Sequence, residues 1–335
     1  MLPRSRAAAC GLALLALLVL PTVAPAADGC ALSDVPLVGR ACAVPGGYRV
    51  LLADGTWIFT HGPDPPPTEL LSYPLSPAPD IAGTLAVCAA TPAEPQGVIV
   101  YANPSDRADR FATMKPQIQA MWQDAAARMY YTGVERGIGA RYRMACEGTG
   151  ALNGLPSVAS VHLAAPVSGT SFGSVVNDLE AAGFNLPTNK YWVWVDLGYG
   201  AGGIGNIWGC EVLACPLQNV GPLYGVTWGH TGYYGSLVMM HENGHNLGAV
   251  QLGAPNTSGA FHCNDGLDIM CYADGGKNSA YDPTVCSGNP PPGPPGARWD
   301  CNGDDYFNPL PAPGSYLSLH WNLASPANLY VVVAP

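Results

Sequence analysis

Two histidines and a glutamate at short spacing are the residues of this chain best suited to chemistry. His241, Glu242 and His245 lie in the stretch HENGHNLG. Residues four apart share one face of a helix, so the two imidazoles can bind one zinc ion. Zinc lowers the pKa of a bound water to about 7, and Glu242 can take its proton during attack on a carbonyl carbon. The same acid can pass that proton to a leaving amine, which predicts a zinc hydrolase with Glu242 as general base.

Further residues give this pattern a family resemblance. Gly248 follows His245 by three residues, where the helix must stop, and DIMCY (residues 268–272) follows downstream. The chain thereby resembles the metzincins, metalloproteases with a zinc helix that ends in glycine and a later methionine turn. The resemblance implies that Met270 lies beneath the metal. It also implies that Tyr272 binds zinc or stabilises the oxyanion, as its counterpart does in some members.

The chain departs from the family at the third zinc ligand. Gln251 stands three residues after the glycine, where the family has His or Asp. His262 precedes Met270 by eight residues, as the third histidine does in matrixin-type members. An amide oxygen is a weak zinc ligand beside imidazole. We therefore predict His262 as the third ligand after an insertion, with Gln251 as the alternative, alone or together with His262.

The segments that must position these residues follow from the apolar pattern. Short apolar runs predict strands, and residue 171 (Ser) and residue 183 (Gly) are a helix start and stop signal. The expected strands are residues 97–102, 140–146, 157–163 and 190–197, and the expected helices are 110–131, 171–183 and 236–248. This order predicts an α/β (α+β) domain with a mixed, twisted sheet. The glycine-rich loop 198–210 lacks a phosphate-binding motif and is expected at the surface or at a sheet edge.

The ends of the chain are expected to differ from this middle part. Residues 1–26 resemble a secretory signal peptide, which predicts an extracellular protein without a membrane anchor after cleavage. Residues 27–80 are expected to form a small N-terminal unit or propeptide, with a hairpin in residues 48–61. The catalytic domain is expected over residues 82–335, with a loop-rich subdomain from about residue 273.

The cysteines fit export. The chain has eleven, and removal of Cys10 with the signal peptide leaves an even number, which predicts up to five disulfides. Pairing cannot be derived from sequence, so proximity alone suggests the pairs 30–42, 210–215, 263–271 and 286–301. A bridge between Cys263 and Cys271 would clamp the segment that carries Met270.

An acidic stretch near the C-terminus contains candidate ligands for a second ion. Asp300, Asn302 and Asp304 place oxygen atoms at alternating positions, like the start of a calcium loop. The expected glycine and closing glutamate are missing, so we expect an acidic turn tied by Cys301, with a calcium site as the alternative.

The amino-acid composition limits the classes of partner that the protein can bind. The formal net charge is −10 and no run of Lys or Arg occurs, which argues against nucleic acid and anionic membranes. We expect a monomer that acts on a protein or peptide substrate. The alternative is a secreted, non-catalytic binding or surface protein on a metzincin scaffold, for which Gln251 is the main support and against which the intact Glu242 speaks.

Overall fold

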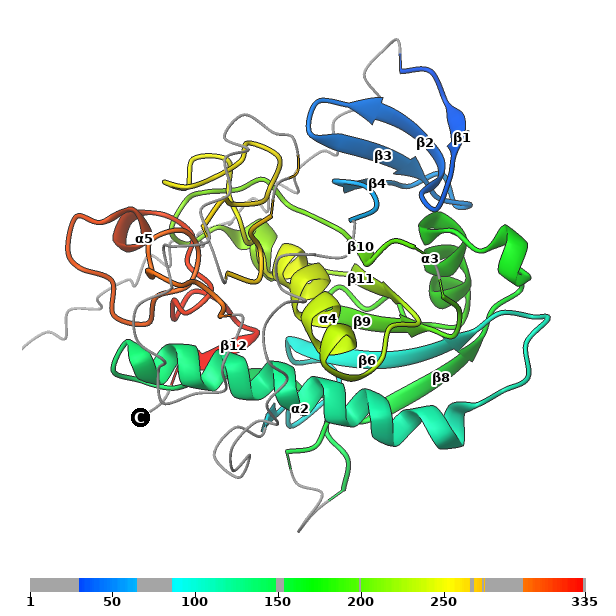
Figure 1. The fold of residues 1–335 in the computed structure, drawn as a ribbon, viewed down its shortest axis with the longest axis horizontal. Coiled ribbons are helices and arrows are strands. Elements are labelled where there is room, and N and C mark those ends of the chain that lie inside the picture. The colour runs from blue at the N-terminus through cyan, green and yellow to red at the C-terminus, as the bar shows by residue number, and fades with distance from the viewer. Residues whose placement is uncertain are drawn as a thin grey trace, which may run out of the picture. The chain divides into compact units, whose positions relative to one another are not determined.

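A computed structural model describes residues 30–64, 86–148, 154–198, 200–265, 268–272, 274 and 298–333. The expected signal peptide and most of the loop after residue 273 lie outside these residues. Residues Ala31–Pro335 form one compact unit. Within it the described residues form a four-stranded and an eight-stranded sheet with helices, a mixed α/β architecture (Figure 1).

The larger sheet is mixed and places its edge near the zinc-helix motif. Its order is β10-β11-β9-β6-β7-β12, with β8 paired to β6 and β5 to β7. The strands are β5 (Val87–Cys88), β6 (Gln96–Asn103), β7 (Ala140–Met144), β8 (Val158–His162), β9 (Asn189–Val195), β10 (Gly203–Gly205), β11 (Leu223–Trp228) and β12 (Val331–Val333). Strands β8, β6, β9 and β11 run parallel, whereas β10 and β12 are antiparallel to their neighbours.

Helices cover both faces of this sheet, which explains why its central strands are apolar throughout. Alternate residues point to opposite faces. On one face Tyr101 and Trp194 pack with α2 (Phe111–Glu135) and α4 (Gly232–Leu247). On the other face Val100 packs with α3 (Phe172–Ala181). The cap residue Ser171 accepts from Ser174 N and forms a capping box, which confirms the predicted start of α3.

A small antiparallel sheet precedes this domain and packs onto α3. Its strands are β1 (Ser33–Val35), β2 (Gly39–Val44), β3 (Gly47–Leu51) and β4 (Trp57–Thr60), in chain order. The β3–β4 pairing confirms the predicted hairpin. Val38 and Val50 join the apolar cluster of α3, and the amide of Phe172 donates to the Leu37 carbonyl. The N-terminal sheet is therefore anchored by both packing and backbone hydrogen bonds.

Helix α4 is buried along most of its length. Every residue from Gly235 to Leu247 is buried, because the sheet lies on one side and the C-terminal part of the chain on the other. Gly248 ends the helix with a left-handed φ of 94°, a conformation that favours glycine. Asn246 donates to the backbone carbonyls of Asn206 and Tyr224, which fixes the helix end on strands β10 and β11.

The C-terminal part packs against the same helix. It contains α5 (Tyr316–Leu319) and β12, and the indole of Trp321 donates to the Leu247 carbonyl at 2.8 Å. Disulfides join Cys210 to Cys215 and Cys263 to Cys271, which confirms two predicted pairs. None of the helices in the described part of the chain is long and apolar enough to cross a membrane.

Two features were not named from the sequence. Cys88 pairs with Cys146, 58 residues away, because β5 and β7 are parallel neighbours. Strand β11 was not predicted, although its apolar and aromatic run LYGVTW between Pro222 and Gly229 carries a strand signal. Cys30, Cys42 and Cys301 are also disulfide-bonded, and Cys286 lies outside the described residues.

Candidate metal centre

Three imidazoles from two segments converge on one point. His241 and His245 project from successive turns of α4, and His262 comes from the loop that follows. Their Nε2 atoms lie 2.9, 3.7 and 3.4 Å from the carboxylate oxygens of Asp64. All three rings are buried. The structure thus brings together the three histidines that the sequence predicted as ligands.

The spacing of the nitrogens suits a metal ion. Two nitrogen ligands of tetrahedral zinc, each about 2.0–2.1 Å from the ion, lie roughly 3.3 Å apart. The Nε2 atoms of His241 and His245 are 3.1 Å apart. His61, Asp64, His245 and His262 together form a group that could hold a metal ion, as do Asp64, His241 and Glu242.

Hydrogen bonds at the opposite ring nitrogens orient two of these imidazoles. His241 Nδ1 lies 2.7 Å from the Ile269 carbonyl oxygen, so it donates there and leaves Nε2 for a metal. His262 Nδ1 lies 3.0 Å from the carboxylate of Asp274. His262 Nε2 is buried and makes no hydrogen bond of good geometry; its nearest charged neighbour is the Asp64 carboxylate at 3.4 Å, so this nitrogen is free to bind a metal ion. The donor set and this available nitrogen fit zinc.

The predicted methionine turn supports the helix from below. A Cβ atom at Gly244 would lie 2.4 Å from Met270 Sδ, so Met270 packs against the helix backbone between the two histidines. The Cys263–Cys271 bridge closes the segment that presents Met270 and begins beside His262. The hydroxyl of Tyr272 donates to Asp64 and therefore also reaches the metal position.

Gln251 lies outside this convergence. Its Oε1 accepts from the Cys210 amide at 2.8 Å, and its Nε2 donates to the carbonyls of Gly248 at 2.7 Å and Trp208 at 3.2 Å. Both ends of the amide thus hold the chain turn after α4. These contacts favour His262 over the alternative ligand Gln251.

Glu242 lies between the metal position and the sheet edge. A Cβ atom at Gly203 would lie 2.4 Å from Glu242 Oε1, and one at Gly205 would lie 2.7 Å from the Glu242 carbonyl. Strand β10 can approach this acid because it is made of glycine at both positions. The glycine-rich loop is therefore a sheet edge. Burial raises the pKa of Glu242 to about 8, and the Asp64 charge adds to that effect.

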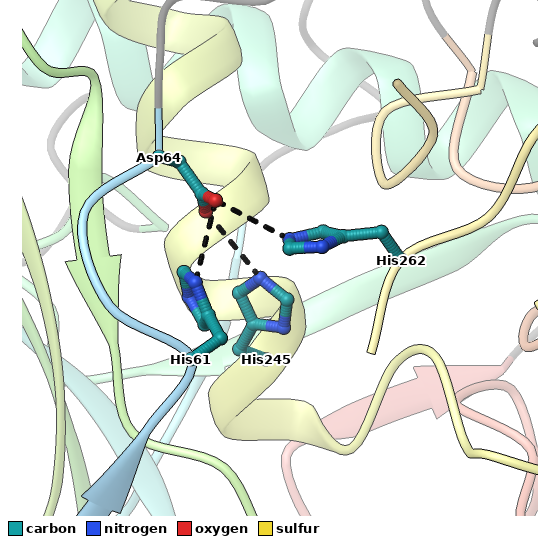
Figure 2. A group of neighbouring side chains, drawn as sticks. All are labelled: His61, Asp64, His245 and His262. Atoms are coloured by element: carbon teal, nitrogen blue, oxygen red, sulfur yellow. Dashed lines mark ion pairs between the residues drawn. The ribbon is translucent and has the colours of Figure 1, made fainter. Parts of the chain in front are cut away.

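Two residues of the site were not predicted, because His61 and Asp64 belong to the N-terminal unit and carry no motif. They follow strand β4 in the stretch HGPD and point into the group of histidines (Figure 2). His61 Nδ1 lies 3.3 Å from Asp64, and its Nε2 lies 3.7 Å from Glu242. The ring of His61 packs on that of His245, with centroids 4.1 Å apart. We call His61, Asp64, His241, Glu242, His245 and His262 the histidine cluster.

Charge is shared unequally within the histidine cluster. Burial opposes ionisation of Asp64, but His61, His262 and His241 together hold the pKa of its carboxyl well below its ordinary value. Burial would lower the pKa of His61 and His262, but the Asp64 carboxylate outweighs it and raises both. Burial, with repulsion from His61, lowers the pKa of His245 well below its ordinary value. Neutral imidazole is the form that binds metals.

A cavity of about 300 Å³ adjoins the site. Its wall includes Gly46, His61 and Asp64 from the N-terminal unit on one side, and His262 and Tyr272 on the other. The N-terminal unit therefore supplies part of the boundary of the space in front of the metal position.

The candidate calcium loop forms an acidic turn. Both carboxylate oxygens of Asp300 accept backbone amides, and Asn302 donates its side-chain amide to Asp265 at 2.8 Å. Asp300 thus accepts amides of its own loop, as in the expected acidic turn, and the side-chain amide of Asn302 is directed to Asp265. Asp304 instead meets Asp265 and Asp305, a group that could hold a metal ion.

Comparisons with models of protein families, with curated proteins and with solved structures found no match for this chain. Function is therefore inferred from the histidine cluster and its surroundings.

Proposed function

We propose that the protein is a secreted zinc-dependent endopeptidase of metzincin type. One observation carries the proposal: three buried imidazoles from α4 and the following loop face one point, with the carboxylate of Glu242 beside it. His241, His245 and His262 would hold the zinc ion. When bound, zinc polarises a carbonyl group and lowers the pKa of water.

The chain's own residues have distinct roles in this proposal. Glu242 takes a proton from the attacking water and gives it to the nitrogen of the leaving amine. Tyr272 directs its hydroxyl to the same position and can donate to the oxygen on which charge develops. Ile269 and Asp274 hold the imidazoles of His241 and His262 in the orientation needed for binding.

An extended peptide is the substrate that this geometry favours. Strand β10 is an edge of the larger sheet and lies directly against Glu242. An edge strand presents unpaired amide and carbonyl groups, to which an extended peptide can add as a further strand. A scissile amide held in this way would lie beside the acid that handles the proton.

Secretion is supported by the disulfides. Bridges such as Cys88–Cys146 persist in oxidising compartments and are rare in the cytosol.

The small group of Asp265, Asp304 and Asp305 has only oxygen donors, which calcium prefers. If it binds calcium, added calcium should raise the melting temperature, and Asp305→Asn should remove that increase.

The test combines zinc content with proteolysis. Zinc per chain is measured by elemental analysis, and casein cleavage is followed in parallel. Four proteins are compared: the wild type, Asp64→Asn, Glu242→Gln and the double variant. We expect one zinc per chain throughout and loss of cleavage with Glu242→Gln. Glu147→Gln, a change far from the site, is the control. If zinc is bound but neither the wild type nor Asp64→Asn cuts casein, the peptidase proposal fails. A non-catalytic binding protein then becomes the better account.

A further inference from the structure

We propose that residues 61–64 are a built-in inhibitor: Asp64 takes the open coordination position of the metal, and the segment occupies the substrate's place on the sheet edge. This inference rests on the proposed zinc site, because it concerns the ligand that completes that site. It predicts that the full chain is latent until residues 61–64 leave the cleft.

The position of the Asp64 carboxylate is the first argument. A catalytic zinc site has three protein ligands and keeps its fourth position open for water or substrate. The Asp64 oxygens lie within 3.7 Å of all three imidazole Nε2 atoms and accept from the Tyr272 hydroxyl. Carboxylate oxygen is a zinc ligand in its own right. Figure 2 shows the carboxylate directed toward the rings of His245 and His262.

The backbone of the segment provides the second argument. The Asp64 amide donates to the Gly203 carbonyl at 3.1 Å, and the Gly202 amide donates to the Asp64 carbonyl at 2.6 Å. Four residues earlier in the chain, Thr60 forms an antiparallel bridge with Asn206. Residues 60–64 therefore run antiparallel beside β10 and use backbone groups that an added peptide strand would need.

His61 supplies the third argument. Its Nε2 lies 3.7 Å from Glu242 Oε2, and its ring packs on His245. A water that is to lose its proton to Glu242 needs this space. The segment therefore covers the metal position, the proton acceptor and the sheet edge together. Asp64 is only 4% exposed, so this arrangement is a built contact and not a loose surface turn.

The test uses cobalt(II) in place of zinc and acetohydroxamic acid as a small ligand of the open position. The samples are the full wild-type chain, Asp64→Asn, and Asp64→Ser as a second variant in case one fails to fold. Asp34→Asn is the matched control, because Asp34 is an exposed acid in the same N-terminal sheet. Visible absorption of cobalt reports the ligand set, titration gives the dissociation constant for acetohydroxamate, and casein cleavage is measured in parallel.

We expect replacement of Asp64 to change the cobalt spectrum, to tighten acetohydroxamate binding at least tenfold and to raise cleavage at least tenfold, with Asp34→Asn equal to wild type. If the spectrum and the acetohydroxamate affinity are the same with and without Asp64, the inference is overturned even if the chain is a peptidase. If acetohydroxamate binding improves but no variant cuts casein, Asp64 is the metal's fourth ligand and the peptidase proposal is the part that fails. If the wild type binds no metal, both are overturned.

Discussion

Asp64 and Asp300 are both buried carboxylates, but their partners differ in kind. Among the described residues, Asp300 accepts from backbone amides of its own loop, those of Gly303 and residues 304–307. Asp64 faces His61, Tyr272 and three imidazoles from distant parts of the chain. A carboxylate closed by local amides organises a loop. A carboxylate placed among side chains that could hold a metal ion can complete their ligand set.

Their ionisation differs in the same sense. The neighbouring histidines hold the pKa of Asp64 well below its ordinary value. Burial raises the pKa of Asp300 to about 6 despite its amide donors, and Asp304 adds repulsion. The ionised form of Asp64 is therefore stabilised by the positive charge of its neighbours. Asp300 is instead held by the geometry of one turn.

The largest effect is expected from Asp300→Ala. Five backbone amides lose their acceptor inside the protein, and each unsatisfied buried donor costs about 1–3 kcal/mol before water or relaxation compensates. We expect the free energy of unfolding to fall by about 3–5 kcal/mol in urea titrations without reductant. Zinc per folded chain should not change. A loss below about 1 kcal/mol would mean that the amides find other acceptors, and the contrast with Asp64 would weaken.

The next effect is loss of metal from His262→Ala. Removal of a residue that merely supports a zinc ligand costs about 10–100-fold in affinity, so removal of a ligand should cost about 100-fold or more. Competition with a zinc chelator measures the dissociation constant. Gln251→Ala is the matched control, since its amide holds backbone groups only. The reverse pattern, with zinc lost from Gln251→Ala and kept by His262→Ala, would assign the third ligand to Gln251.

The smallest effect concerns pH. Burial raises the pKa of Asp305 to about 8, with repulsion from Asp300 as a further cause. Between about pH 4 and pH 8 the folded state holds a proton that the unfolded chain has released, so this contribution to stability is lost as pH rises. From pH 5 to pH 8, the free energy of unfolding of Asp305→Asn should therefore rise relative to that of the wild type by about 1 kcal/mol or more. Urea unfolding in the presence of a chelator measures this difference. A constant difference between the two proteins would refute this assignment.

The sequence predicted what local patterns determine. The central strands, helix α3 with its Ser171 cap, the hairpin in the N-terminal sheet and the left-handed glycine after α4 all follow from apolar periodicity and capping chemistry. The four-residue spacing placed His241 and His245 on one helix face for the same reason.

The rest depends on contacts between distant segments. Nothing in HGPD distinguishes His61 and Asp64 from a polar turn, because their partners lie about 180 or more residues later in the chain. Strand β10 is three residues long and largely glycine, which carries a loop signal. Its glycines are needed because Glu242 leaves no room for a side chain at these positions. The acidic turn at Asp300 was expected, but its amide partners belong to a turn whose geometry the sequence does not give.

The most direct test of the zinc site is X-ray absorption at the zinc edge of the metal-loaded full chain. The structure predicts three imidazole nitrogens at about 2.0–2.1 Å and one oxygen at about 2.0–2.2 Å. The oxygen comes from Asp64 in the full chain, so replacing Asp64 by Asn should change that shell while the three imidazoles remain. Sulfur scattering near 2.3 Å, fewer than three imidazoles, or no bound zinc would contradict the account.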